Sequence, residues 1–144
     1  MDITYTNTIT PDEFNILHEA VGWGVVSNQE RIQKALNCSN FLIAARINEK
    51  IIGMARVIDD GLQALLLDVI VLPEYQRQGI GKTLMNYVME YLYILSQNGG
   101  IKVNLLTAPD KVGFYEKFGF ISRPNDKLGP GMTQWIQKEN ITCR

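Results

Sequence analysis

The segment V-L-P-E-Y-Q-R-Q-G-I-G-K, residues 71–82, decides the fold, because it joins an apolar run to an amphipathic one. The run before it, L-L-L-D-V-I-V at residues 65–71, is apolar except for one acid, which is typical of a strand covered on both faces in mid-sheet. After Gly79 apolar residues recur at helical spacing, which predicts a long helix that ends at residues 98–100, Asn-Gly-Gly. The residues of this apolar face are Ile80, Leu84, Val88, Tyr91, Leu92 and Leu95.

The turn between strand and helix has the composition of an anion site. Gly79 and Gly81 remove side chains that would shield backbone N–H groups, and the first N–H groups of the helix have no partner within it. The helix dipole adds partial positive charge there, and Arg77 and Lys82 flank the turn. The alternative is that the glycines only allow a tight turn. The spacing fits neither a Walker loop nor a dinucleotide fingerprint.

Outward from this segment, the chain alternates strand and helix patterns without a linker or repeat, so we expect one domain over residues 1–144. Before the segment we expect a strand at 3–6, helices at 11–20 (after a Thr10 cap) and from 27 or 28 to 37, and hairpin strands at 41–47 and 51–58. After it we expect a strand at 101–106, a short helix at 110–117, and final strands at 120–122 and 132–136. The long helix crosses between two strands that we expect to be parallel.

Composition excludes several classes of protein. The 144 residues are 46% hydrophobic and 20% charged, which is ordinary globular composition. A net charge of -1 argues against nucleic-acid binding as the main task, and no apolar run is long enough for a membrane span. The N-terminus lacks the pattern of a signal peptide. We expect Cys38 and Cys143 to be free thiols in a reducing cytoplasm, and two cysteines with one histidine disfavour a structural zinc site.

Two motifs carry a resemblance to a known family. Q-R-Q-G-I-G at residues 76–81 resembles the Q/R-x-x-G-x-G/A signature of the GNAT family, the GCN5-related N-acetyltransferases. G-F-Y-E-K-F-G-F at residues 113–120 resembles that family's next motif, a helix that carries a tyrosine and ends in F-G-F. The resemblance is strong over residues 40–122 and weak over residues 1–39, the region in which such enzymes vary with their substrates.

The resemblance implies a fold and a cosubstrate. The fold is α/β: a mixed, mostly antiparallel central sheet with a splayed parallel strand pair and helices on both faces. The signature turn of such proteins binds the pyrophosphate of acetyl-CoA, and the edge of the preceding strand binds the pantetheine arm. Carried over to this chain, the turn residues are Arg77, Gln78, Gly79, Ile80, Gly81 and Lys82, and the strand residues are Val69, Ile70 and Val71. No metal is implied.

Tyr115 matches the family tyrosine beside the thioester sulfur, where it would protonate the departing thiolate as a general acid. The alternative is that Tyr115 simply packs among Phe114, Phe118 and Phe120. The family often has an asparagine seven residues before this tyrosine. Ala108 stands there, so that contact is not carried over.

Asp68 is the acid in the apolar strand. Such an acid is costly unless it is paired or functional. One interpretation is a general base, direct or through water, whose pKa burial would raise. The other is a structural carboxylate that pairs with Arg56 or caps a turn. Strand alternation would put Asp68 on the face of Ile70 and Leu67 on the face of Val69.

Two further residues are candidates for the acceptor side. Trp23, in V-G-W-G, lies in a loop that often walls the acceptor pocket in this family, and the alternative is a loop tryptophan packed on the core. Arg56 lies near the end of the hairpin and would face the acceptor. We interpret His18 as an ordinary helix residue.

The hypothesis is therefore an acetyl-CoA-dependent N-acetyltransferase that moves an acetyl group directly to a primary amine, in a small molecule rather than a protein tail. The alternatives are a non-catalytic acetyl-CoA sensor, a protein N-acetyltransferase, and a toxin-type transferase acting on aminoacyl-tRNA, which the near-neutral charge disfavours. We expect no nucleic-acid or membrane partner. The resemblance leaves room for a homodimer, although the sequence shows no interface signature.

Overall fold

The computed structural model describes residues 2–137. They divide into two compact units, the first ending at Leu105 and the second beginning at Leu106. The first unit contains β1 (Ile3–Thr6), α1 (Pro11–Ala20), α2 (Gln29–Asn37), β2 (Phe41–Ile47), β3 (Lys50–Asp59), β4 (Gln63–Val71), the 3-10 turn Pro73–Tyr75, α3 (Ile80–Ser96) and β5 (Lys102–Asn104). The second contains the 3-10 turn Pro109–Lys111 and α4 (Val112–Glu116). The expectation of one domain over residues 1–144 stays a prediction.

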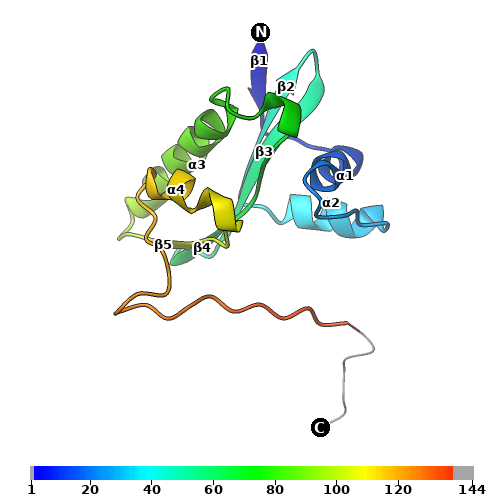
Figure 1. Cartoon of the computed structure of the whole chain (residues 1–144). Coiled ribbons are helices and arrows are strands. Elements are labelled where there is room, and N and C mark those ends of the chain that lie inside the picture. The colour runs from blue at the N-terminus through cyan, green and yellow to red at the C-terminus, as the bar shows by residue number, and fades with distance from the viewer. Residues whose placement is uncertain (1, 138–144) are drawn as a thin grey trace. The chain divides into compact units, whose positions relative to one another are not determined.

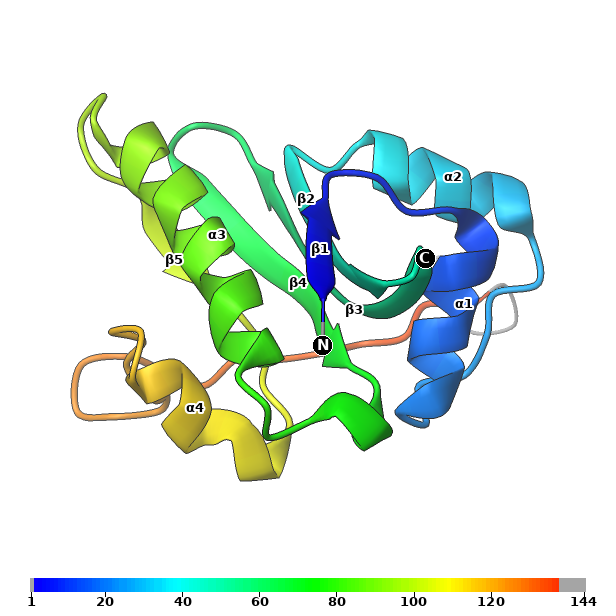
Figure 2. The same ribbon diagram turned by 90° about the horizontal axis from the view of Figure 1, so that it is seen from above.

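A five-stranded sheet in the order β1-β2-β3-β4-β5 forms the first unit. The first four strands are antiparallel to their neighbours, and β4 and β5 are parallel. Helix α3 crosses from β4 to β5 over one face, and α1 and α2 lie over the other (Figures 1 and 2). The expected mixed, mostly antiparallel sheet with helices on both faces is confirmed.

The core lies between α3 and the sheet and continues beneath α1. Helix α3 buries one apolar face, as its periodicity predicts, with Met85 added to the expected set. The buried residues of α3 are Ile80, Leu84, Met85, Val88 and Leu92. Gly53 of β3 lies directly beneath Leu84. A Cβ at Gly53 would stand 3.2 Å from Leu84 Cδ1 and 2.9 Å from the carbonyl oxygen of Ile70. Helix and sheet therefore approach closely beside β4.

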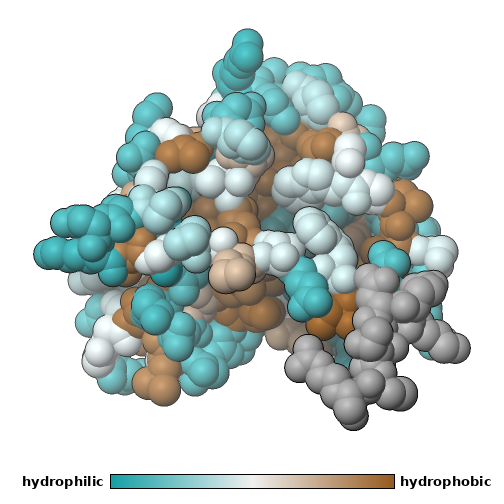
Figure 3. Space-filling view, turned by 60° about the horizontal axis from the view of Figure 1, so that its bottom comes forward, coloured by the Kyte–Doolittle hydropathy of each residue, from teal (hydrophilic) through white to brown (hydrophobic). Residues whose placement is uncertain are grey.

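The predictions for the second unit are only partly confirmed. The short helix forms at Val112–Glu116, within the expected range. The expected strands at 120–122 and 132–136 are wrong: neither segment makes a strand ladder, and Ile121, Met132 and Trp135 are exposed. The alternation of apolar residues there indicated strands, but a strand needs a partner for its backbone groups. On the face drawn in Figure 3, apolar side chains appear as separate brown patches among polar ones.

Candidate active site

A β-bulge interrupts β4 at Asp68. Met54 pairs with Ile70 and Arg56 pairs with Leu67, so Asp68 and Val69 together oppose the single residue between them on β3. Asp68 has a φ of 54°, which is left-handed and uncommon for a residue other than glycine. Bulges bend a strand and redirect its side chains, and they gather next to active sites. The expected alternation of side chains in β4 does not continue past the bulge. Arg56 lies opposite Leu67, yet it binds the side chain of the next residue, Asp68.

Beyond the bulge, the β5-facing edge of β4 is open. Strand β5 pairs only with Gln63–Leu65, so residues 66–71 have no strand partner on that side within the described chain. The N–H of Leu72 donates to the Ile52 carbonyl at 2.8 Å, which makes Ile52–Leu72 a hydrogen-bonded pair. Antiparallel pairs alternate, so the backbone groups of Ile70 point to β3 and those of Val71 point to the open edge. The splayed strand pair is confirmed.

The signature turn holds the chain in a conformation that exposes backbone N–H groups. Arg77 has a φ of 63° and Gly79 a φ of 84°. Gly79 is the N-cap of α3 and offers no side-chain cap, and the first helical hydrogen bond runs from Thr83 N–H to the Gly79 carbonyl at 3.0 Å. The N–H groups of residues 80–82 therefore have no cap, which is the arrangement of an anion site.

The side chains of the turn divide between core and solvent. Ile80 is buried, so it contributes its backbone N–H and not its side chain to any ligand. Arg77, Gln78 and Lys82 are exposed beside the turn. Gln76 returns to the strand, since its Nε2 donates to the Val71 carbonyl at 2.9 Å. This bond ties the turn to the open edge.

Asp68 is the centre of a cluster that links three elements. Arg56 of β3 donates from Nε to Asp68 Oδ2 at 2.5 Å, and His18 Nε2 of α1 lies 2.9 Å from Asp68 Oδ1. The three side chains are only 10–16% exposed. The predicted pairing of Asp68 with Arg56 is thus confirmed.

The expected direction of the Asp68 pKa shift is wrong. Burial acts to raise the pKa of Asp68, but the hydrogen bonds from His18 and Arg56 outweigh it and hold the pKa below its usual value. A carboxylate with both oxygens engaged and a lowered pKa is a poor proton acceptor. Its role as a base stays a prediction that these contacts do not support.

The loop between α1 and α2 presents Trp23 beside this cluster. Gly22 and Gly24, on either side of it, have φ of 79° and 80°, left-handed values that suit glycine. Asn15 fixes the loop with two bonds to the backbone of Val26, each 2.9 Å. The rings of Trp23 and His18 meet edge to face with centroids 5.7 Å apart, while 56% of Trp23 is exposed. Both sequence interpretations of Trp23 therefore have support: it packs in part and offers a free face.

Tyr115 lies in the second unit, on α4, in an aromatic cluster. Its ring meets Phe114 and Phe120 edge to face, with centroids 5.1 and 6.1 Å apart. Burial raises the pKa of Tyr115 to about 12. The phenol therefore keeps its proton at ordinary pH, as a general acid must before it reacts. The expected packing is confirmed for Phe114 and Phe120, and the catalytic role stays a prediction.

The first unit brings together Trp23, Arg56 and Asp68, three predicted site residues, and adds His18, which the sequence interpretation missed. The available signal was its place on the apolar face of α1, where Phe14, Leu17 and His18 are the buried residues. A buried histidine on such a face needs a polar partner from another element, and only the fold shows that it is Asp68.

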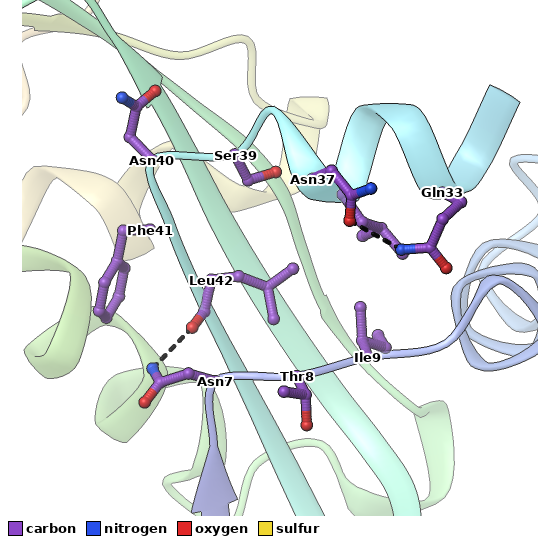
Figure 4. Close-up of a pocket in the computed structure, with 10 residues that line it drawn as sticks. Asn7, Thr8, Ile9, Gln33, Asn37, Ser39, Asn40, Phe41 and Leu42 are labelled. Atoms are coloured by element: carbon purple, nitrogen blue, oxygen red, sulfur yellow. Dashed lines mark hydrogen bonds between the residues drawn. The ribbon is translucent and has the colours of Figure 1, made fainter. Parts of the chain in front are cut away.

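A cavity of about 470 Å³ lies elsewhere in the described residues (Figure 4). It opens between α2, the start of β2 and the segment after β1, and none of its lining residues is charged or was predicted as a site residue.

Within residues 2–137, no group of three or more His, Cys, Asp or Glu side chains is placed to hold a metal ion. No helix of that part of the chain is long and apolar enough to cross a membrane. Cys38 is an exposed free thiol, and Cys143 lies outside the described residues.

Comparison with known proteins identifies the same signature region. A sequence model described as acetyltransferase (GNAT) domain matches residues 38–122. A protein named uncharacterized N-acetyltransferase ycf52, from Pyropia yezoensis, is 32% identical over 122 residues, which are 81% of this chain and 68% of that protein. The chloroplastic GCN5-related N-acetyltransferase 1 of Arabidopsis thaliana is 29% identical over 86% of this chain and 62% of its own length.

Solved structures give the same picture. A probable acetyltransferase from Staphylococcus aureus superposes with a TM-score of 0.79 at 25% identity, covering 93% of this chain and 100% of the other. A GNAT-family acetyltransferase from Streptococcus pneumoniae superposes with a TM-score of 0.71 at 28% identity, covering 95% and 98%.

Proposed function

The chain belongs to the GNAT family of acetyltransferases, and from this premise we propose that it transfers the acetyl group of acetyl-CoA directly to a primary amine of a small molecule. The proposal rests on one observation: the open edge of β4 after the bulge leads directly into the uncapped N-terminus of α3. Acetyl-CoA supplies an activated thioester together with an anionic pyrophosphate. An extended arm with a phosphate end matches an open strand edge followed by free N–H groups.

The residues divide the task of binding by chemistry. The backbone N–H groups of Ile80, Gly81 and Lys82 hold the pyrophosphate, with Gly79 giving the turn its left-handed conformation. Arg77 and Lys82 add positive charge. Backbone groups of Val69 and Val71 bind the pantetheine arm, and the bond from Gln76 holds the Val71 carbonyl in register. The Ile70 backbone is hydrogen-bonded to β3, so Ile70 keeps Val69 and Val71 in place and does not bind the arm itself.

In the transfer itself, the amine nitrogen forms a bond to the thioester carbonyl carbon and the carbon–sulfur bond breaks. Tyr115 gives its phenolic proton to the sulfur and regains one from the amine through water. A phenol with a pKa of about 12 does not release a free proton, so its transfer belongs to the transition state in which the thiolate forms. No covalent enzyme intermediate is required.

The acceptor meets the exposed face of Trp23. Arg56, the other predicted substrate residue, is engaged by Asp68 and largely buried, so we assign it a structural part. A rigid aromatic face favours an amine that carries an apolar or aromatic group.

The first test is a CoA-release assay with acetyl-CoA and a panel of amines, aminosugars, polyamines and lysine peptides, run beside Tyr115→Phe. We expect turnover with one class of small amine, and a fall in kcat of about a hundredfold in the variant, with acetyl-CoA affinity unchanged. Tyr93→Phe, at an exposed position on α3, is the matched control and should act like the parent.

Other outcomes favour the alternatives. Turnover only with peptides indicates a protein N-acetyltransferase. Tight acetyl-CoA binding without turnover indicates a sensor, and no binding contradicts the proposal. A cytoplasmic location and a homodimer stay predictions, to be tested by fractionation and by light scattering. Two relatives from Arabidopsis thaliana are chloroplastic by their names.

A further inference from the structure

Both ring nitrogens of His18 face oxygen atoms that only accept hydrogen bonds. Nδ1 lies 2.8 Å from the backbone carbonyl of Phe14, and Nε2 lies 2.9 Å from the carboxylate of Asp68. A neutral imidazole has one N–H and one lone pair, so one of these contacts would set a lone pair against an acceptor. Both contacts become hydrogen bonds only when both nitrogens carry a proton.

The surroundings of His18 favour the same charged form. The ring of Phe14 stacks on the imidazole with centroids 3.7 Å apart, and an aromatic face attracts a cation. The Asp68 carboxylate supplies the opposite charge. Arg56 binds the other oxygen of that carboxylate, so a doubly protonated His18 completes a row of cation, anion and cation.

The anion in this row is the bulge residue itself. A left-handed conformation costs a non-glycine residue free energy and persists only where the surroundings hold it. Asp68 is held from two elements, by His18 of α1 on Oδ1 and by Arg56 of β3 on Oδ2. Each bond fixes one carboxylate oxygen, and together they fix the direction in which the Asp68 side chain leaves the strand.

We propose that doubly protonated His18 is a positioning residue that holds the β4 bulge at Asp68, and through it the open strand edge on which the acyl donor binds. The last step of this inference rests on the proposed function. Loss of the Nε2 proton leaves a lone pair facing the carboxylate, so the clamp weakens as pH rises. The edge then loses the geometry that pairs it with an extended arm.

The ionisable groups that face His18 are few. From β4 it meets Asp68, and through Asp68 it meets Arg56 of β3. From its own helix it meets the Phe14 carbonyl, and from the following loop the uncharged Trp23. Arg56 also reaches the Ser39 hydroxyl at 3.4 Å. Among residues 2–137, no other ionisable side chain forms an ion pair or hydrogen bond with these three.

The protonation can be measured directly, because His18 is the single histidine of the chain. Nitrogen-15 NMR of the ring distinguishes the two neutral tautomers from the imidazolium. Because both nitrogens face acceptors, we expect the doubly protonated ring, with both N–H protons protected from exchange. A neutral ring would overturn the proposal.

Three variants separate positioning from packing. In His18→Gln the amide Nε2 still reaches Asp68 and does not titrate, whereas His18→Asn is too short to reach it. Glu19→Gln, at the exposed next position of α1, is the control. We expect the Asn variant to bind acetyl-CoA about tenfold more weakly, and the Gln and control variants to bind as the parent does at neutral pH.

The pH profile supplies the readout that packing alone would not move. As pH rises, acetyl-CoA binding by the parent should weaken by about tenfold more than binding by His18→Gln, which has no ring proton to lose. Parallel profiles for the two proteins would contradict the proposal.

Amide hydrogen exchange of residues 66–71 tests the bulge without any ligand. Exchange there should be faster in His18→Asn than in His18→Gln, and equal rates would overturn the proposal. If the parent fails to bind acetyl-CoA while this difference is seen, the proposed function fails and the positioning role of His18 stands.

Discussion

At the scale of single residues, Asp68 combines a left-handed backbone conformation with a buried negative charge. Its carboxylate is removed from water, which opposes ionisation, yet two donors from separate elements hold it ionised. A buried ion pair is modest evidence for stability, but removing one partner is costly because it leaves charge without compensation. Asp68 therefore holds two cations in place as well as one bulge.

Replacement of Asp68 by asparagine should destabilise the protein by about 3 kcal/mol at neutral pH, since His18 and Arg56 lose their shared anion. The pKa of Asp68 is lowered on folding, so its contribution is present above the unfolded value near 3.8 and is lost as pH falls through the lower folded value. Urea unfolding at several pH values should show the two proteins converging at low pH.

Glu90→Gln, on the exposed side of α3, is the control for this series and should leave stability unchanged at every pH. A difference between Asp68→Asn and the parent that stays constant down to about pH 2 would contradict the assignment of the effect to this carboxylate.

At the scale of elements, α1 carries a reciprocal cap that sets where it begins. The Thr10 hydroxyl accepts from the Glu13 N–H at 3.2 Å, and the Glu13 carboxylate accepts from the Thr10 N–H at 3.0 Å. Glu13 also pairs with Arg46 of β2, so the same side chain joins the helix to the sheet. The start of α1 is thus fixed locally and its direction is fixed by a strand contact.

Thr10→Ala should cost about 1 kcal/mol of unfolding free energy, because the Glu13 N–H in the first turn of α1 loses its hydroxyl acceptor. Thr10→Ser keeps the hydroxyl and should retain most of the stability. Thermal unfolding of both variants measures the difference, and equal losses would assign the effect to the methyl group instead.

The approach of β3 to α3 gives a second prediction at this scale. Gly53→Ala should destabilise by about 1–3 kcal/mol, since the added methyl group would press on the Ile70 carbonyl beside the open edge. Gly113→Ala has open space around the added atom and lies in a helix, so it should be neutral or slightly stabilising. Urea unfolding of the two variants tests the contrast, and equal effects would refute it.

At the scale of the whole molecule, perturbed groups lie at both ends of the pH scale. Hydrogen bonding lowers the pKa of Glu13, Asp60 and Asp68. Burial raises the pKa of Tyr91 and Tyr115 to about 12, helped at Tyr91 by its bond to Asp59. Acid stability and alkaline stability are therefore limited by different side chains.

Stability should fall below about pH 5, where the carboxylates become protonated, and above about pH 9, where the tyrosines ionise. The carboxylates contribute above their unfolded pKa values and lose this contribution as pH falls. The two tyrosines contribute below about pH 10 and lose their contribution as pH rises toward about 12. Ultraviolet titration should show two of the six tyrosines ionising late, with Tyr91→Phe and Tyr115→Phe each removing one.

Features that depend on near neighbours in the chain could be predicted from the sequence alone. The bounds of β1, α1 and β2 follow from alternation, caps and turns, and those of α3 from its apolar face. The anion-binding turn follows from two glycines at a helix start, and the family from two motifs. Each of these signals lies within one short stretch of chain, so no other element is needed to express it.

The positions of Asp68 and His18 depend on contacts between elements that are far apart in the chain. The bulge depends on the register between β3 and β4, and no local pattern marks an acid that must adopt a left-handed conformation. His18 and Asp68 are fifty positions apart and become partners only when α1 packs on the sheet. The predicted direction of the Asp68 pKa shift was wrong for the same reason. Burial can be predicted from an apolar run, but the hydrogen-bond donors that oppose its effect on the pKa come from elsewhere in the chain.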